Sequence, residues 1–405
     1  MSLSSAAEHL GERLRACGHV RIYTHDDADG IAGAAILCQA LARAGIGFCV
    51  SVRDRIVPED VRGEENVLLC DLGAALEDLP EETMVIDHHL PHFAGPWHVN
   101  PRLEGEDGET GCSAAGMAYR VAQELGDNRD LAGLAITGMI GDRQTCTGTN
   151  RDICNDGMAA GTIVPRRGLR LPGRDAAEQL ILAVDPYIEG ISGEETSVSS
   201  LLAGCTTEES TDSECLISRL VLEMAPAAPA EAMEALYGDR YELGREIIHD
   251  AHTLAAVLDA CGKSGKGGLA IALCLRSSTG LQEAWEIARA YRHTVIGAVR
   301  SVRRVSDTAP FFETENASMT GAVADAIAYS QMHTAPVVVM ACTGDTCTVS
   351  ARRPAGIDTD LGSLLHRIAR ECGGEGGGHA ARAGARVPAE QTGRFQNGIL
   401  EALTS

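Results

Sequence analysis

Short apolar runs alternate with helical patterns along the first 190 residues. Four runs have the length and composition of buried strands, and they are residues 19–23, 47–52, 66–70 and 83–86. Three segments repeat apolar residues at helical spacing, and they are residues 31–45, 113–125 and 131–141. This alternation predicts an α/β lobe built on a mainly parallel sheet.

The pattern changes after residue 190. The polar stretch from Thr206 to Glu214 predicts a loop, and residues 216–233 and 242–261 predict helices. A second α/β pattern follows, with strands expected at 269–275, 335–342 and 347–353 and a helix at 361–371. We therefore expect two α/β lobes with a cleft between them. Residues 1–190 would form the first lobe, residues 191–262 a helical connector, and residues 263–405 a smaller lobe with a mixed sheet.

Composition limits the class of protein. The 405 residues exceed one ordinary domain, and no run of about 18 apolar residues predicts a membrane span. The N-terminus lacks the basic and apolar regions of a signal peptide. The 14 cysteines are scattered without a C-x-x-C pair, which favours reduced thiols in a cytoplasmic protein over disulfides or a zinc site.

Charge is distributed unevenly. Residues 1–265 hold 20 basic and 44 acidic side chains, whereas residues 266–405 hold 14 and 13. Lys263 and Lys266 are the two lysines, so phosphate contacts would be made mostly by arginine forks. The acidic first part would repel a polyanion unless cations neutralise its centre, although solubility alone also accounts for acidity.

Carboxylates and imidazoles follow the predicted strands of the first lobe. His25, Asp27 and Asp29 follow the first strand, and Asp71 follows the third. The fourth strand leads into Asp87, His88 and His89, and Asp142 ends a predicted helix. The carboxyl ends of parallel strands share one edge of the sheet, where ligands bind. Each short motif alone is consistent with a helix cap or a polar turn. Together, these donors are suited to two divalent ions such as Mn²⁺, Mg²⁺ or Zn²⁺.

These motifs resemble those of the DHH phosphoesterase superfamily. The resemblance rests on His25 to Gly30, Asp71, Asp87 to His89, and Gly141-Asp142. Near the C-terminus, Gly376-Gly377-Gly378-His379 and Ser350-Ala-Arg352 resemble signatures of the DHH-associated C-terminal domain. The nearest likeness is to archaeal RecJ-like nucleases, although Asp259 and Lys263 stand where those signatures often have Asn and Arg.

The resemblance implies a role for each matched residue. His25, Asp27 and Asp71 would hold one metal ion, and Asp29, Asp71, His88 and Asp142 the second. Mn²⁺ is the expected ion and Mg²⁺ the alternative. His89 would face the scissile phosphate, and Asp87 would orient a histidine. The family assigns no role to Asp26.

The second lobe would then bind substrate. Glycines 376–378 would let phosphate approach the backbone closely, and the neighbours His379 and Arg382 favour this interpretation over a mobile surface loop. Arg352 would clamp a phosphate beside Ser350, with a solvated strand edge as the alternative. For Glu246, His249 and His252, the pattern favours a solvated helix face over a metal site.

The predicted function is metal-dependent phosphodiester hydrolysis, with exonucleolytic cleavage of single-stranded DNA or RNA expected first. A phosphodiesterase acting on short oligonucleotides or cyclic dinucleotides is the first alternative, and the net acidity favours it mildly. A replication-complex scaffold that retains a metal site is the second. Replication or repair proteins are the protein partners that the resemblance suggests.

Overall fold

The computed structural model describes residues 2–205, 212–306, 309–354 and 356–404. The chain divides into two compact units. Unit 1 comprises residues 1–167 and 239–289, and unit 2 comprises residues 168–238 and 290–405. Each unit therefore combines two separate stretches of sequence, unlike the three consecutive ranges that the sequence suggests.

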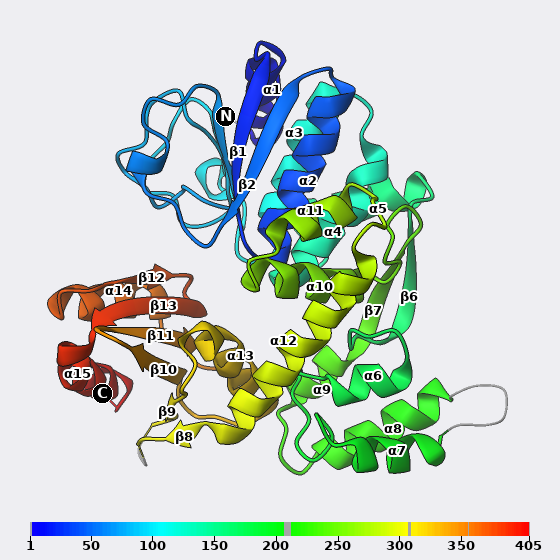
Figure 1. The fold of residues 1–405 in the computed structure, drawn as a ribbon, viewed down its shortest axis with the longest axis vertical. Helices are drawn as coiled ribbons and strands as arrows, with labels where there is room; N and C mark the ends of the chain where they lie inside the picture. Colours follow the sequence, from blue (N-terminus) through cyan, green and yellow to red (C-terminus); the bar gives the residue numbers. More distant parts are fainter. Residues whose placement is uncertain (1, 206–211, 307–308, 355, 405) are drawn as a thin grey trace. The chain divides into compact units, whose positions relative to one another are not determined.

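Unit 1 is built on a five-stranded parallel sheet (Figure 1). Its strands are β1 (His19–His25), β2 (Gly47–Arg53), β3 (Val67–Cys70), β4 (Met84–Ile86) and β5 (His98–Val99). The strand order is β2-β1-β3-β4-β5. Every residue of β3 and β4 is buried, as expected for parallel strands that are covered on both faces.

The helices of unit 1 pack on this sheet and on one another. They are α1 (Leu3–Arg15), α2 (Ala28–Arg43), α3 (Ala114–Leu125), α4 (Ala132–Gly141), α5 (Gly148–Ala159), α10 (Ala251–Lys263) and α11 (Gly267–Cys274), with the 3-10 turns η1 (Pro58–Asp60), η2 (Pro101–Glu104) and η3 (Arg129–Leu131). Helix α2 packs against β1, β2, α3 and α4. A Cβ atom at Gly33 would lie 2.8 Å from Cys70 Sγ, so α2 approaches β3 as closely as glycine allows.

Three elements contain the boundaries between the units. The chain passes from unit 1 to unit 2 within β6 (Ile163–Leu169), returns within β7 (Tyr237–Leu243) and passes again within α12 (Leu281–Ser301). Strands β6 and β7 pair with each other in a two-stranded sheet.

The first stretch of unit 2 is helical. It contains α6 (Ala176–Ile181), α7 (Glu195–Ala203), α8 (Ser213–Met224) and α9 (Ala230–Leu236). These helices bury a hydrophobic cluster that includes Leu180, Leu201, Leu220 and Leu236. The cluster gives this part of unit 2 its own core.

The second stretch of unit 2 forms a six-stranded mixed sheet. Its strands are β8 (Arg303–Arg304), β9 (Phe311–Glu313), β10 (Val337–Thr343), β11 (Thr346–Arg352), β12 (Glu375–Gly378) and β13 (Arg382–Pro388). They lie in the order β12-β13-β11-β10-β9-β8, with β9 and β10 parallel and the other neighbours antiparallel. The accompanying helices are α13 (Thr320–Ser330), α14 (Leu361–Glu371) and α15 (Thr392–Thr404), with turns η4 (Ala317–Met319) and η5 (Ala389–Gln391).

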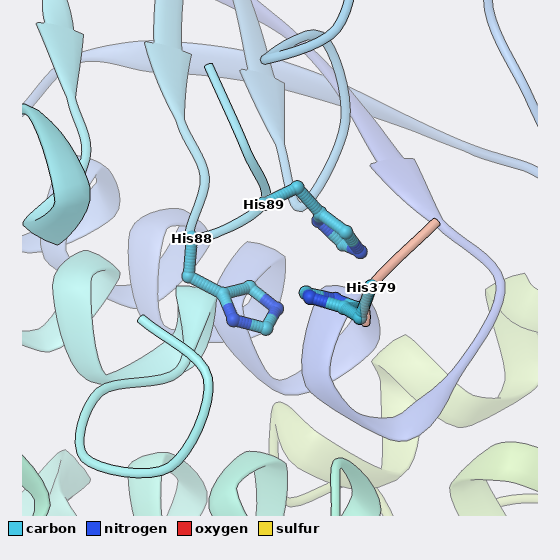
Figure 2. Close-up of side chains that lie close together, drawn as sticks. All are labelled: His88, His89 and His379. Carbon is cyan, nitrogen blue, oxygen red and sulfur yellow. The ribbon is translucent and has the colours of Figure 1, made fainter. Parts of the chain in front are cut away.

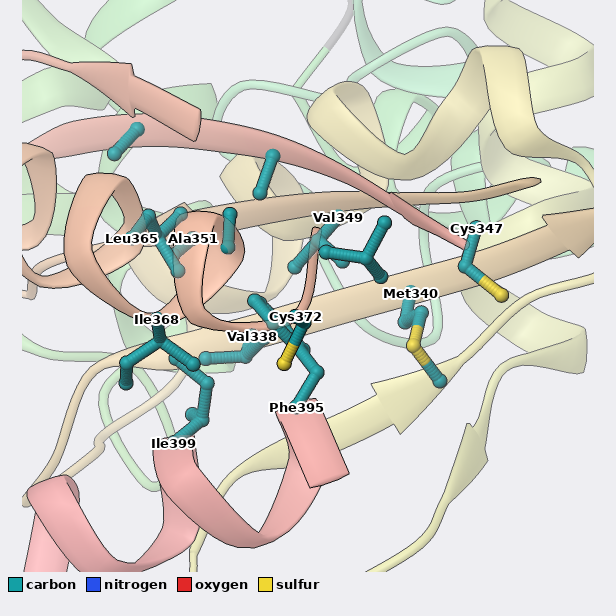
Figure 3. Packing of buried hydrophobic residues seen from close by; sticks show 14 of the residues in the cluster. Val338, Met340, Cys347, Val349, Ala351, Leu365, Ile368, Cys372, Phe395 and Ile399 are labelled. Carbon is teal, nitrogen blue, oxygen red and sulfur yellow. The ribbon is translucent and has the colours of Figure 1, made fainter. Parts of the chain in front are cut away.

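Both faces of the mixed sheet are covered. Side chains alternate across a strand, so Val337 and Val339 of β10 join a core with α13, while Val338 and Met340 join the opposite core. Figure 3 shows this second core, in which side chains of α14 and α15 pack on β10 and β11. Phe395 of α15 is fully buried there.

The expected fold class is confirmed, since an all-parallel sheet lies in the N-terminal part and a mixed sheet in the C-terminal part. The expected strand at 269–275 is wrong, because this apolar run forms helix α11. A short run that is apolar throughout has no periodicity to distinguish the two structures. The expected helix at 216–233 is interrupted between α8 and α9, where Pro226 and Pro229 lie.

The expected helix at 242–261 begins only at Ala251, with Asp250 as its N-cap. Glu246 and His249 therefore precede the helix, and the helical face proposed for them with His252 is wrong. His249 Nδ1 instead lies 3.0 Å from the Leu243 carbonyl oxygen. Residues 206–211 of the predicted polar loop lie outside the described residues.

The expectation of reduced thiols is wrong for two pairs of cysteines. Cys205 bonds to Cys215, and Cys342 bonds to Cys347, while the ten other cysteines are free. The register of β10 and β11 places Cys342 directly opposite Cys347, which brings the two sulfurs together.

The sequence predicts no membrane-spanning segment. Among the described residues, no helix combines the length and the apolar character needed to cross a lipid bilayer.

We expect Phe395→Ala to lower the free energy of unfolding by about 3–5 kcal/mol, because it removes a fully buried aromatic ring and leaves a cavity. Urea denaturation measures this change. Arg394→Ala is the control, since the exposed Arg394 precedes Phe395 on the same helix and should matter by less than about 0.5 kcal/mol. Equal effects of the two substitutions would contradict the packing described for α15.

Candidate metal centre

The acidic and histidine side chains of unit 1 gather at the carboxyl ends of three neighbouring strands. His25 is the last residue of β1, Asp71 follows β3, and Asp87 follows β4. Strand β1 lies between β2 and β3 in the sheet, so the chain runs from β1 to β2 on one side and then crosses back to β3 on the other. This reversal of strand order creates the crevice in which open α/β sheets bind ligands.

Asp27 has two roles in the structure. It is the N-cap of α2, where its Oδ1 accepts a hydrogen bond from the Gly30 backbone at 3.0 Å. Its Oδ2 lies 2.6 Å from His25 Nδ1. A Cβ atom at residue 30 would lie 2.7 Å from the His25 carbonyl oxygen, so glycine is required for this turn. The Asp27 carboxylate therefore caps helix α2 with one oxygen and offers the other as a metal donor.

Asp29 lies in the first turn of α2 and is fully buried. Its two oxygens accept hydrogen bonds from Ala114 N and Ala115 N, at 2.7 and 3.0 Å, where α3 begins. Burial raises the pKa of Asp29 well above its ordinary value, and the carboxylates of Asp142 and Asp71 raise it further. The helix N-terminus offsets part of this cost.

Asp71 lies between the other donors. Its φ of 57° is left-handed, a conformation that is uncommon outside glycine and is often found at functional sites. The two carboxylate oxygens are buried and accept no hydrogen bond from the described residues. They lie 3.3 Å from His25 Nδ1 and 3.4 Å from His88 Nε2. Burial, followed by repulsion from Asp27, raises the pKa of Asp71.

The Asp87 carboxylate is hydrogen-bonded on both oxygens. Oδ1 accepts hydrogen bonds from His88 N, His89 N and His89 Nδ1, at 2.8, 3.1 and 2.7 Å. Oδ2 accepts one from Ala74 N at 2.9 Å. Burial alone would raise the pKa of Asp87, but the neighbouring imidazoles and these hydrogen bonds hold it far below its usual range. Asp87 thereby fixes the backbone and one ring of the motif.

His88 and His89 present their rings differently. Figure 2 shows both imidazoles on the segment after β4, with ring centroids 4.6 Å apart and planes tilted by 53°. His88 is buried, with Nε2 lying 2.9 Å from Asp142 Oδ2 and Nδ1 lying 2.7 Å from the Gly108 carbonyl oxygen. The side chain of His89 is 36% exposed. Burial lowers the pKa of each ring, yet the neighbouring carboxylates raise both above the ordinary value.

Two groups of donors in unit 1 can each hold a cation without sharing a residue. His25, Asp27 and Asp71 form one group, and Asp29, His88 and Asp142 form the other, while a third group of Asp71, Asp87 and His89 shares Asp71 with the first. In each group, one ligand atom from every residue lies within 4.8 Å of the others. The oxygens of Asp71 lie close to a histidine of each group. Carboxylate and imidazole donors around a buried carboxylate that accepts no hydrogen bond fit two divalent ions.

Several residues near this cluster were not anticipated. Lys263, at the end of α10, contacts the Asp26 carboxylate, whose Oδ1 lies 3.5 Å from His25 Nε2. A Cβ atom at Gly262 would lie 1.8 Å from the Asp26 carbonyl oxygen, so α10 packs directly against the metal loop. In the sequence, the feature that pointed to this contact was the positive charge of Lys263, which is one of two lysines in an acidic chain.

A hollow of about 470 Å³ lies at the end of β2 and is lined by residues that include Tyr23, Arg53 and Arg55. The register of β1 and β2 pairs His25 with Arg53, and Asp54 and Asp60 also line the hollow. Two arginines directly after a predicted strand were the signal for this feature.

The predicted substrate residues of unit 2 lie on neighbouring strands. Arg352 of β11 is directly opposite Arg382 of β13. Arg352 is 8% exposed and donates to Asp325 from Nε and Nη2, at 2.6 and 3.2 Å. Arg382 donates to the same carboxylate at 3.1 Å. Ser350 Oγ donates to Thr320 Oγ1 at 3.0 Å. Helix α13 thus contacts all three residues, and Asp325 links the two arginines.

The three glycines lie in edge strand β12 and not in a loop. A Cβ atom at Gly376 would lie 2.7 Å from the Leu365 carbonyl oxygen, and one at Gly378 would lie 2.7 Å from that of Arg382. At Gly377 nothing lies within 4 Å. Packing explains the outer two glycines and leaves Gly377 open to a ligand. His379 follows the strand, and its backbone N–H donates to the Arg382 carbonyl at 2.8 Å.

Comparison with known proteins identifies two family models in this chain. Residues 19–139 match the DHH family N-terminal domain, and residues 308–405 match the DHHA1 domain. An uncharacterized protein from Methanocaldococcus jannaschii is 25% identical over 415 residues, which covers 95% of this chain and 93% of that protein.

Two further comparisons concern proteins named RecJ. The single-stranded-DNA-specific exonuclease RecJ of Thermus thermophilus is 29% identical over 250 residues, which covers 54% of this chain and 37% of that protein. The crystal structure of RecJ from Thermus thermophilus in complex with Mn²⁺ matches with a TM-score of 0.63 at 20% identity, covering 99% of this chain and 54% of that one. The structural match establishes a shared fold.

We expect Asp71→Asn to stabilise the protein in a chelating buffer, by about 1–3 kcal/mol, because it removes a buried carboxylate that accepts no hydrogen bond. Urea denaturation measures the change. Asp78→Asn, at an exposed position after the same strand, is the matched control and should leave stability unchanged. A less stable Asp71→Asn protein would contradict the account of this cluster as electrostatically strained.

Proposed function

Because the chain belongs to the DHH family and carries a C-terminal DHHA1 domain, we propose that it is a metal-dependent phosphodiesterase acting as an exonuclease on single-stranded nucleic acid. The observation that carries this proposal is the Asp71 carboxylate, buried without a hydrogen bond and close to a histidine of each donor group. Such a carboxylate serves naturally as a bridge between two cations.

His25, Asp27 and Asp71 would hold one ion, and His88, Asp142, Asp29 and Asp71 the second. Hard oxygen donors combined with imidazole favour Mn²⁺, with Mg²⁺ as the alternative. When bound, the two ions supply a water of lowered pKa and a positive clamp for the oxygens of the reacting phosphate.

His89 is the side chain that would face the scissile phosphate. Asp87 bonds its Nδ1 at 2.7 Å, which orients the ring and leaves Nε2 as the nitrogen to meet substrate. Burial lowers the pKa of His89, but the charge and hydrogen bond of Asp87, together with the charge of Asp71, raise it above its ordinary value. A protonated ring can donate a hydrogen bond to a phosphate oxygen or a proton to the departing alcohol.

The arginines support a phosphodiester chain as the substrate. Arg53 and Arg55 line the hollow at the end of β2 together with Asp54 and Asp60, and the two guanidinium groups would bind a phosphate next to the scissile one. Arg382, Gly377 and His379 of unit 2 would bind a further phosphate or sugar. Binding energy remote from the reacting bond positions that bond. The relative named as a single-stranded-DNA-specific exonuclease favours a single strand.

Two alternatives differ in their observable consequences. The acidity of residues 1–265 favours a small substrate such as a dinucleotide or a cyclic dinucleotide over a long polyanion. A scaffold would need no complete set of donors, and both donor groups of unit 1 are complete here. The donor groups therefore favour an enzyme over a scaffold.

We expect the protein with Mn²⁺ to shorten end-labelled single-stranded DNA or RNA from one end and to produce a ladder of products on a denaturing gel. Asp71→Ala, which removes the shared carboxylate, should reduce cleavage to background. Cleavage confined to di- and trinucleotides would support the small-substrate enzyme instead. If no substrate is cleaved, the scaffold is favoured and the exonuclease is excluded.

We expect Arg382→Ala to weaken binding of phosphorothioate-linked DNA about 10- to 100-fold, which corresponds to the loss of one charged hydrogen-bonding group. Arg382 is the cleaner test, because Arg352 is more buried and makes two hydrogen bonds to Asp325, so its loss would disturb the packing of unit 2 more. Arg386→Ala removes the same charge from an exposed position of the same strand and is the control. Equal losses from Arg382→Ala and Arg386→Ala would argue against a specific site on β13, as would a change in metal content.

A further inference from the structure

We propose that Gln144, together with Asn150, is a positioning residue that holds the His88 ring in the orientation and tautomer needed to bind the second metal ion. This inference rests on the metal centre of the proposed function. Gln144 lies two residues beyond Asp142 and is not among the residues that the family motifs identify. It is 8% exposed, and Asn150 is 1% exposed.

The ring of His88 is defined by what its two nitrogens face. Nδ1 lies 2.7 Å from the Gly108 carbonyl oxygen, which can only accept a hydrogen bond, so Nδ1 carries the proton. Nε2 faces Asp142 Oδ2 at 2.9 Å and Asp71 Oδ1 at 3.4 Å. With a cation bound, the Gly108 carbonyl would keep the proton on Nδ1 and leave the Nε2 lone pair to the metal ion. A histidine ligand depends on this kind of outer contact.

Gln144 holds that carbonyl in place. Its Nε2 donates to the carbonyl oxygens of Gly108 and Cys112, each at 3.2 Å, and lies 3.3 Å from His88 Nδ1. Its Oε1 accepts a hydrogen bond from Asn150 Nδ2 at 2.8 Å. The two carbonyl oxygens can only accept, so they fix which end of the Gln144 amide is the donor. Both donor hydrogens of the Gln144 amide are thus directed at the segment that carries Gly108.

The same segment also packs against the backbone of the histidine motif. A Cβ atom at residue 108 would lie 2.5 Å from the His88 carbonyl oxygen, so only glycine fits there. Arg102 Nε donates to that carbonyl oxygen at 2.9 Å. The backbone of His88 is therefore anchored independently of Gln144. Loss of Gln144 should affect the ring contact at Gly108 first and leave the position of the backbone unchanged.

The two donor groups depend on Gln144 to different degrees. His88 belongs to the group with Asp29 and Asp142, whereas His25, Asp27 and Asp71 form the other group. The hydrogen bonds of the Gln144 amide lead to Gly108, whose carbonyl oxygen faces Nδ1 of the His88 ring. A side chain that acted only on overall stability would weaken both ions alike. A positioning role predicts selective loss of the second ion.

The test is Mn²⁺ titration of the full chain, prepared without metal, by isothermal calorimetry, with bound ions counted by mass spectrometry. Gln144→Met keeps a similar volume and removes the amide. We expect it to weaken the second ion about 10- to 100-fold and the first ion less than about threefold. Gln39→Met is the matched control, because Gln39 Nε2 donates to the Cys274 carbonyl at 3.0 Å in the same unit, away from the metal loops. It should change neither affinity.

A second comparison separates this inference from the proposed function. If Gln144 acts through His88, then Gln144→Met should add little to the loss of affinity for the second ion that His88→Ala already causes. Independent effects of the two substitutions would add. Equal weakening of both ions, or full additivity with His88→Ala, would overturn the positioning role. The positioning role would also be overturned if the wild-type protein binds two ions and Gln144→Met binds both with unchanged affinities. That outcome would leave the metal centre intact. A wild-type protein that binds no Mn²⁺ would overturn the metal centre itself.

Discussion

Mutual repulsion among buried carboxylates is the constraint on which the N-terminal unit depends. Parallel strands bring Asp27, Asp29, Asp71 and Asp87 to one edge, and each negative charge raises the cost of the others. The fold offsets this cost locally. Asp27 caps α2, Asp29 accepts from the first turn of α3, and Asp87 accepts four hydrogen bonds. Asp71 accepts no such hydrogen bond from the described residues, and its cost is what a bound cation would relieve.

The sequence predicted the elements whose signals are local. The strands before His25, Asp71 and Asp87 are short, apolar and followed by polar residues, and the structure places them in one parallel sheet. Helix α11 was missed because its apolar run has no polar face. Strand β12 was missed because glycines carry no strand propensity, although packing against α14 and β13 demands them.

The candidate site was predictable only in part. Donors such as His25 and Asp142 belong to compact motifs that can be recognised along the chain. Gln144 and Lys263 reach the site through tertiary contacts, with Gly108 and Asp26 respectively. No spacing rule in the sequence connects Lys263 with Asp26, because 237 residues separate them. The pairing of Asp325 with Arg352 and Arg382 was hidden for the same reason.

If unit 2 binds the proposed phosphate, its arginine pair is already arranged for that ligand. One carboxylate, Asp325, faces two guanidinium groups on adjacent strands, so the local charge stays positive while Arg352 remains aligned. An aspartate that contacts both arginines lowers the cost of holding them together before any anion arrives. The alignment then costs the ligand little when it binds.

The division of unit 1 into two separate stretches affects how the protein is made. Residues 19–139 contain the donors of strands β1, β3 and β4, but the lysine that contacts Asp26 lies at residue 263, beyond the first stretch of unit 2. During synthesis from the N-terminus, the aspartate-rich loop leaves the ribosome long before its lysine partner does. The nascent chain must hold these like charges together without Lys263, so early capture of cations would aid its folding on the ribosome.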